Sequence, residues 1–158
     1  MPSIRDIARG ATMHGAEILV KDTKHIPEEK FCFCPMGCAK TAEDILRECA
    51  GTNARIAASL RGEDPSSSVA YLDFQKKVDA ASGLEAFGKL IMESSEIVRA
   101  AIDGIADADL DKQVKMPWGA MFLLGAAILL PSQHMNYHDG QINYIQTLLG
   151  DSAFHWHE

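Results

Sequence analysis

The chain has 158 residues, of which 47% are hydrophobic and 23% charged, and it carries a net charge of -7 with a pI near 5.3. This is the composition of a globular domain long enough to bury a core, and its acidic balance argues against nucleic acid or anionic lipid as partners. The N-terminal MPSIRDIARG lacks the apolar segment of a secretory signal, and the longest apolar run, residues 119–130, is too short to span a membrane. We therefore expect one domain over residues 1–158, located in the cytoplasm, with reduced cysteines.

Apolar residues recur at helical spacing along most of the chain, whereas strand signals are weak. The pattern predicts four amphipathic helices, near residues 2–22, 41–61, 83–105 and 119–149. Thr41 with Asp44 forms the pattern of a capping box at the start of the second helix. Ser82 with Glu85 forms the same pattern before the third. Pro131 falls inside the fourth helix and is expected to kink it.

Four such helices indicate an all-α fold, a four-helix bundle. The connection from Gly62 to Ala81 is long for a loop between neighbouring helices of a bundle. Because a segment of this length can cross the whole bundle, the second and third helices are expected to run parallel. A short additional helix is expected within Tyr71 to Val78.

The segment HMNYHDGQ places two histidines four residues apart on the buried side of the fourth predicted helix. At about 100° per residue, His138 and Gln141 lie within about 40° of His134. Leu130 and Ile145 share this face. Burying two imidazoles without partners is costly, and side chains at this spacing can reach one ion. The pair therefore favours a metal site over two hydrogen-bonded core histidines.

Two histidines do not complete a metal site, so a third ligand must come from another helix. Glu48 is preferred because it borders the apolar face of the second helix, although a solvated carboxylate is the alternative reading of that position. Cys49 is more central but typical of a small buried residue, and His14 of the first helix is a rival. Glu48, His134 and His138 would suit zinc with an open position or ferrous iron, with nickel or manganese as alternatives.

The motif H-x-x-Y-H-x-G-Q, here residues 134–141, resembles the DinB/YfiT-like family of proposed metalloenzymes. The stretch PEEKFCFCPMGCAKTAEDILRECAGTN resembles the loop and second helix of that family, and the likeness spans nearly the whole chain. The resemblance implies a four-helix bundle with up-down-down-up topology and a long crossover between helices two and three. It also implies a metal on three histidines. His134 and His138 match two of them, whereas Glu48 stands in the place of the third.

Relatives of known activity include thiol S-transferases that use bacillithiol or mycothiol, and a maleylpyruvate isomerase. The resemblance thus implies a metal-dependent transferase, hydrolase or isomerase with a small-molecule substrate, a divalent metal (zinc, iron or nickel) and a low-molecular-weight thiol. Homodimerisation is expected on the resemblance alone. Gln141 and Tyr137 are candidates to orient the substrate or to support the metal ligands. The alternative is a non-catalytic, stress-associated bundle whose histidines are structural.

Two further segments contain metal-ligating residue types. Cys32, Cys34 and Cys38 precede the second helix, but their spacing differs from the C-x2-C of structural zinc sites. We expect an ordinary loop there, with neither zinc nor a disulfide. The C-terminal FHWH, with His155 and His157, is expected to pack its aromatic residues on the end of the bundle, with metal binding as the weaker alternative.

Overall fold

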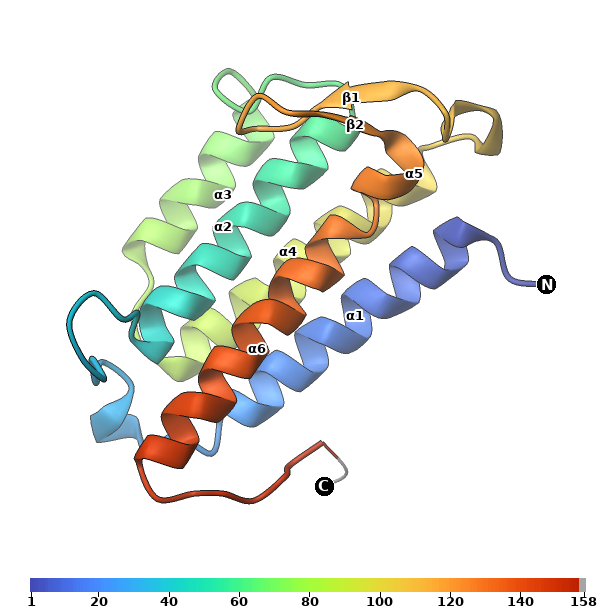
Figure 1. Cartoon of the computed structure of the whole chain (residues 1–158). Helices are drawn as coiled ribbons and strands as arrows, with labels where there is room; N and C mark the ends of the chain where they lie inside the picture. Colours follow the sequence, from blue (N-terminus) through green and yellow to red (C-terminus); the bar gives the residue numbers. More distant parts are fainter. Residues whose placement is uncertain (157–158) are drawn as a thin grey trace.

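The computed structural model describes residues 1–156 of the chain (Figure 1). Within these residues, four helices of 19 or 20 residues dominate: α1 (Ile4–Thr23), α2 (Ala42–Leu60), α4 (Leu84–Asp103) and α6 (Leu130–Leu148). Shorter elements join them: η1 (Glu28–Lys30), α3 (Val69–Ala80), η2 (Asp107–Asp109), β1 (Gln113–Lys115), β2 (Met121–Leu123) and α5 (Leu124–Ala127). None of these helices is both long and apolar enough to cross a membrane.

Side-chain caps define where α1 and α2 begin. In α2, the Thr41 hydroxyl accepts a hydrogen bond from the amide of Asp44, and the Asp44 carboxylate accepts one from the amide of Thr41. The predicted capping box is therefore confirmed. The one predicted at Ser82 is wrong, because α4 starts after Gly83, whose φ of 81° suits glycine and which has no side chain to cap the helix.

Apolar side chains from all four long helices meet between them along the length of the bundle. α2 packs against α4 and α6, while α1 packs against α4 and α6 from the other side. Fully buried side chains come from each long helix: Leu19, Ile45, Phe87, Ile91, Met135 and Ile142. Burying a side chain of this size stabilises the fold by about 1.5–3 kcal/mol. The buried side chains of α2 and α6 therefore determine which faces of these two helices meet.

The connection between α2 and α4 contains α3, which confirms the short helix predicted within residues 71–78 and extends it at both ends. Its first turn is capped by the hydroxyl of Ser68. Figure 1 shows α3 beside α2, carrying the chain from the hairpin end of α2 back to the opposite end, where α4 begins.

Residues 119–129 form part of a hairpin and a short helix, so the prediction that the last helix begins near residue 119 is wrong. β1 and β2 pair antiparallel, with Val114 opposite Phe122. The amide of Met116 donates to the carbonyl of Ala120 at 2.8 Å and closes the turn. Residues 119–130 are apolar or glycine throughout, so their sequence carries neither a helical nor a strand period.

The last long helix, α6, begins at Leu130, so Pro131 lies in its first turn. In the first turn of a helix, backbone N–H groups have no acceptor within the helix. Proline, which has no N–H, therefore breaks no hydrogen bond at this position. The predicted kink at Pro131 is wrong. His134 and His138 consequently share one continuous helix, one turn apart.

Candidate metal centre

The side chains of Glu48, His134 and His138 converge where α2 lies against α6. The Nε2 atoms of the two histidines are 3.2 Å apart. Glu48 Oε1 lies 3.9 Å from Nε2 of His134 and 3.7 Å from Nε2 of His138. Metal bonds of about 2.0–2.2 Å place the ligand atoms of one ion roughly 3–4 Å apart. The three atoms therefore fit a shared divalent ion.

His138 is held with its Nε2 atom facing this point. Its ring is only 2% exposed, and its Nδ1 lies 2.7 Å from Oε1 of Gln141. The amide group of Gln141 donates in turn to the hydroxyl of Tyr137 at 3.3 Å, which fixes the amide oxygen toward the histidine. Because an amide oxygen can only accept, His138 carries its hydrogen on Nδ1 and leaves the Nε2 lone pair free for a ligand bond.

His134 is kept neutral by its surroundings. Burial, followed by the nearby charge of His138, lowers the pKa of His134 to about 4. Burial likewise lowers the pKa of His138 below its ordinary value. The two rings meet edge to face at 83°, so their Nε2 atoms approach each other from different planes. Neutral imidazoles arranged in this way are the form that binds a metal.

Glu48 is ionised and already has a cation beside it. The ammonium group of Lys40, on the loop before α2, pairs with Oε2 of Glu48 and leaves Oε1 facing the histidines. Partial burial raises the pKa of Glu48, but the hydrogen bond from Lys40 and the charges of His138 and Lys40 outweigh it, so the pKa lies below its usual range.

Cys49 is a second source for the third ligand. Its sulfur and one ring nitrogen from each of His134 and His138 all lie within 4.8 Å of one another. Cys49 is fully buried, and burial raises the pKa of its thiol far above the ordinary value. Glu48 offers an oxygen that is already ionised, 3.7 and 3.9 Å from the two Nε2 atoms, whereas the Cys49 thiol would first have to lose its proton. The other rival, His14, is exposed on α1 and does not join the group.

The cysteines before α2 lie apart from this centre. Cys32, Cys34 and Cys38 are exposed with free thiols. The sulfur of Cys34 contacts the carbonyl of Ala39 at 3.3 Å, and that of Cys32 contacts the Glu43 carboxylate at 3.5 Å. All three cysteines therefore lie on an exposed loop before α2.

A second group of metal-ligating residue types joins the end of α1 to the C-terminal tail. His25, Asp151 and His155 each offer an atom within 4.8 Å of the others, and His155 Nε2 lies 2.8 Å from the Asp151 carboxylate. The rings of His25 and His155 are stacked at 3.5 Å and 10°, so an ion in the plane of one would lie far from the plane of the other. The group thus packs the tail onto the bundle. His157 lies outside the described residues.

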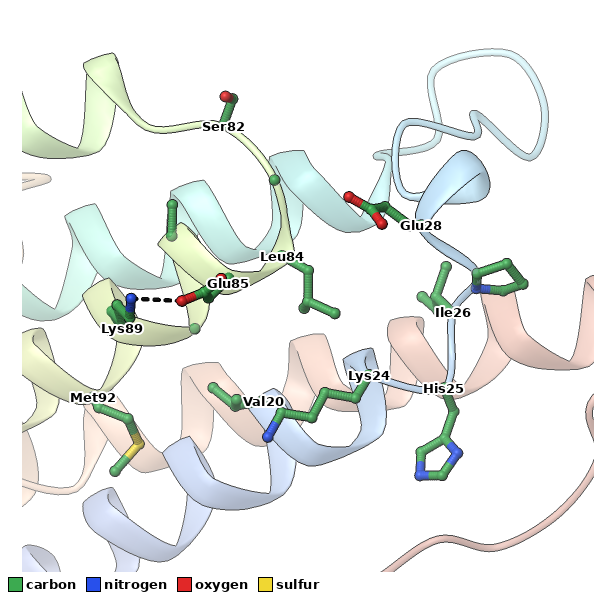
Figure 2. A pocket seen from close by; sticks show the side chains of 14 residues that line it. Val20, Lys24, His25, Ile26, Glu28, Ser82, Leu84, Glu85, Lys89 and Met92 are labelled. Atoms are coloured by element: carbon green, nitrogen blue, oxygen red, sulfur yellow. Dashed lines mark hydrogen bonds and ion pairs between the residues drawn. The ribbon is translucent and has the colours of Figure 1, made fainter.

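A cavity of about 940 Å³ lies between the end of α1 and the start of α4 (Figure 2). Apolar side chains line part of it: Val20, Ile26, Leu84 and Met92. Its charges balance, because Lys89 pairs with Glu85 at 2.7 Å and Lys24 shares the lining with Glu28. None of the lining residues belongs to the group around His138, so this cavity is not part of the candidate metal centre.

The sequence pattern did not reveal a buried pair of carboxyl groups next to His138. Asp22 of α1 is fully buried and Asp139 of α6 is 4% exposed. Asn143 donates to both carboxylates, at 2.8 Å to Asp22 and 3.3 Å to Asp139. Burial, then the charge of Asp22, raises the pKa of Asp139 to about 7. Because the two aspartates come from opposite ends of the chain, no local motif could have identified the pair.

Sequence comparisons yield no relative: no family model matches the chain, and no curated protein matches it. Among solved structures, the chain is similar to the crystal structure of YjoA, a DinB-like protein from Bacillus subtilis. The TM-score is 0.70 over 94% of this chain and 96% of that one, at 13% sequence identity. The chain has the DinB-like fold. The motif at residues 134–141 therefore predicted the fold correctly, and the likeness at this identity extends to the fold alone.

Proposed function

We propose that this protein is a metal-dependent enzyme whose divalent ion is held by Glu48, His134 and His138. The observation that carries the proposal is the approach of three ligand atoms to within 3.2–3.9 Å of one another, with both histidines neutral. A set of two nitrogens and one carboxylate oxygen suits zinc, ferrous iron or nickel. Three protein ligands also leave room for a substrate, as in catalytic metal sites.

Each surrounding residue then has a defined role. The ion supplies Lewis acidity, which polarises a bound carbonyl or lowers the pKa of a nucleophile. Gln141 holds His138 in the tautomer that exposes Nε2, and Tyr137 holds Gln141. Lys40 keeps Glu48 ionised and adds a positive charge at the rim of the centre.

The reaction class follows the resemblance and the DinB-like fold: a thiol-dependent S-transferase, or a related hydrolase or isomerase, acting on a small molecule. A low-molecular-weight thiol is the expected second reactant. The helices follow the up-down-down-up order, which the return of the chain along α3 supports. On the resemblance we also propose a homodimer as the functional unit, and on the sequence pattern the cytoplasm as its location.

A structural role for the histidines is the competing function, and one observation favours it. Lys40 already neutralises Glu48, and Gln141 already partners His138, so little charge is left uncompensated without an ion. Nδ1 of His134 is buried with no hydrogen-bond partner among the described residues, but an ion at Nε2 would not change this, so the atom does not separate the two functions. The observation against it is the position of Glu48, whose Oε1 faces both Nε2 atoms at 3.7 and 3.9 Å, which is too far for a hydrogen bond but suits a shared ion.

Metal analysis of protein purified without a nickel column separates the two functions. The enzyme proposal predicts one zinc, iron or nickel ion per chain, and Glu48→Ala or His138→Ala should each lose most of it. His14→Ala, the matched control on α1, should keep the ion. Cys49→Ser should also keep it, whereas loss in that variant would make Cys49 the third ligand. A wild-type protein without a bound ion, and with no affinity for added zinc, would support the structural role.

A further inference from the structure

A cavity of about 400 Å³ opens beside His134, on the side of the candidate centre that faces the hairpin. Seven residues line it: Thr52, Ile56, Trp118, Leu130, Gln133, His134 and Tyr137. None of them is aspartate, glutamate, lysine or arginine. A charged group entering this cavity would lose water without gaining a partner, whereas an apolar group would gain from leaving water.

Trp118 is fixed over the cavity by the hairpin turn. The side chain of Met116 is 2% exposed, so it anchors one end of the turn in the core. The amide of Gly119 donates to the carbonyl of Met116 at 2.8 Å, and Arg55 of α2 reaches the carbonyl of Pro117 at 3.5 Å. The indole also packs edge to face on Phe122, with ring centres 6.1 Å apart.

Two large aromatic side chains of this lining are left open to water. Trp118 is 54% exposed and Tyr137 is 66% exposed, while Ile56 of α2 is almost fully buried. Exposed aromatic rings around an apolar hollow are typical of sites that bind an organic molecule. The volume of this cavity is within the usual range for such sites, and His134 is one of the residues that line it.

We infer that this cavity takes an uncharged, six-membered aromatic ring of the substrate, clasped between Trp118 and Tyr137. An oxygen of the same molecule then faces the point between Glu48, His134 and His138; this part of the inference rests on the proposed function. Trp118 acts as a specificity residue because it contacts the ring and not the ligand atoms. The sugar or peptide part of a thiol reactant would have to lie outside the cavity.

Two hydroxamates of different size test the inference on zinc-loaded protein. Acetohydroxamate and benzohydroxamate bind a metal through the same oxygens, but only the second brings an aromatic ring. Calorimetric titration should show benzohydroxamate binding at least about tenfold more tightly, the gain expected from burying one ring. Trp118→Ala should reduce that ratio to about threefold or less while acetohydroxamate binds as before. Trp118→Phe should keep most of the ratio.

Tyr144→Ala is the matched control, because Tyr144 is an exposed aromatic residue of α6 that does not line the cavity. Its ratio should equal that of the wild type. Equal affinities of the two hydroxamates for the wild type, or an unchanged ratio in Trp118→Ala, would overturn the inference.

Metal-free protein provides a test that does not depend on the ion. Titration with phenol should shift the indole N–H signal of Trp118 in NMR spectra, and Thr52→Trp, a substitution of a half-buried lining residue that fills the cavity, should abolish the shift. If phenol binds in this way but neither hydroxamate binds zinc-loaded protein, the ring site stands and the proposed metal function fails. If phenol leaves the Trp118 signal unchanged, the ring site is wrong.

Discussion

At the level of single residues, the chemistry of the centre depends on which histidine nitrogen carries a hydrogen. Gln141 settles this for His138, because its amide oxygen accepts from Nδ1 and leaves Nε2 as the free lone pair. For His134 the protonation state is set by burial, which disfavours the charged ring. Neither effect is visible in the spacing of the two histidines, which predicted that they share a face and can reach one ion.

Gln141→Leu removes the acceptor of His138 at nearly constant volume. If the bound ion depends on the orientation of this ring, zinc affinity should fall about 10- to 100-fold, measured by competition with a chelator of known affinity. Tyr137→Phe, which removes only the more distant hydroxyl, should change the affinity much less. An affinity in Gln141→Leu equal to that of the wild type would show that Gln141 does not support the ligand.

The pH dependence of metal binding should follow the lowered pKa values. A proton competes with the ion only when the pH approaches the pKa of the folded, metal-free histidine. Because the pKa of His134 is about 4 and that of His138 is also below its ordinary value, zinc affinity should persist as the pH falls through 6.5, the usual histidine value, and decline toward about pH 4. Release of half the ion near pH 6.5 would contradict this account.

At the level of elements, α2 and α4 start in different ways although their sequences look alike. Both segments read as S/T-x-x-D/E, but only Thr41 caps its helix, because Gly83 with its positive φ ends the preceding turn one residue beyond Ser82. The hairpin is a second case. It places Trp118 in the lining of the cavity beside His134, yet its second strand comes from an apolar run without a helical or strand period.

Thr41→Ala and Ser82→Ala are matched substitutions that should differ in effect. The first removes the hydroxyl that accepts from the amide of Asp44, and it should lower the free energy of unfolding by about 1 kcal/mol in urea denaturation. The second removes a hydroxyl that does not cap α4, so it should have an effect within about 0.5 kcal/mol of zero. Equal losses in the two variants would contradict the assigned helix starts.

At the level of the whole molecule, the sequence predicted what repeats along one helix and missed several contacts between distant segments. The four long helices and the face shared by His134 and His138 follow from spacing. The ion pair of Lys40 with Glu48 does not, nor does the buried pair of Asp22 and Asp139, because each depends on how one element is placed against another. The resemblance of residues 134–141 supplied the fold that the likeness to the DinB-like structure confirms.

The buried carboxyl pair should make stability depend on pH. The pKa of Asp139 is raised above its unfolded value of 3.8 to about 7, so its contribution is fully present below about pH 4 and is lost as the pH rises through 7. Asp139→Asn cannot ionise. Its Tm should therefore exceed that of the wild type by roughly 5 °C at pH 8, and the difference should shrink toward pH 5.

Thermal unfolding at several pH values measures this difference. Asp111→Asn, a substitution of an exposed aspartate, serves as the control and should show no comparable pH-dependent gain. A difference between Asp139→Asn and the wild type that stays constant from pH 5 to pH 8 would mean that the pKa of Asp139 is not raised in the folded state.

The central claim is that Glu48, His134 and His138 bind one ion, and anomalous diffraction from crystals of zinc-loaded protein tests it most directly. We predict one anomalous peak per chain, with Nε2 of both histidines and Oε1 of Glu48 each about 2.0–2.2 Å from it. Lys40 should remain beside Oε2 of Glu48. A peak bonded to the sulfur of Cys49 at about 2.3 Å with Glu48 turned to solvent, or no peak between α2 and α6, would contradict the claim.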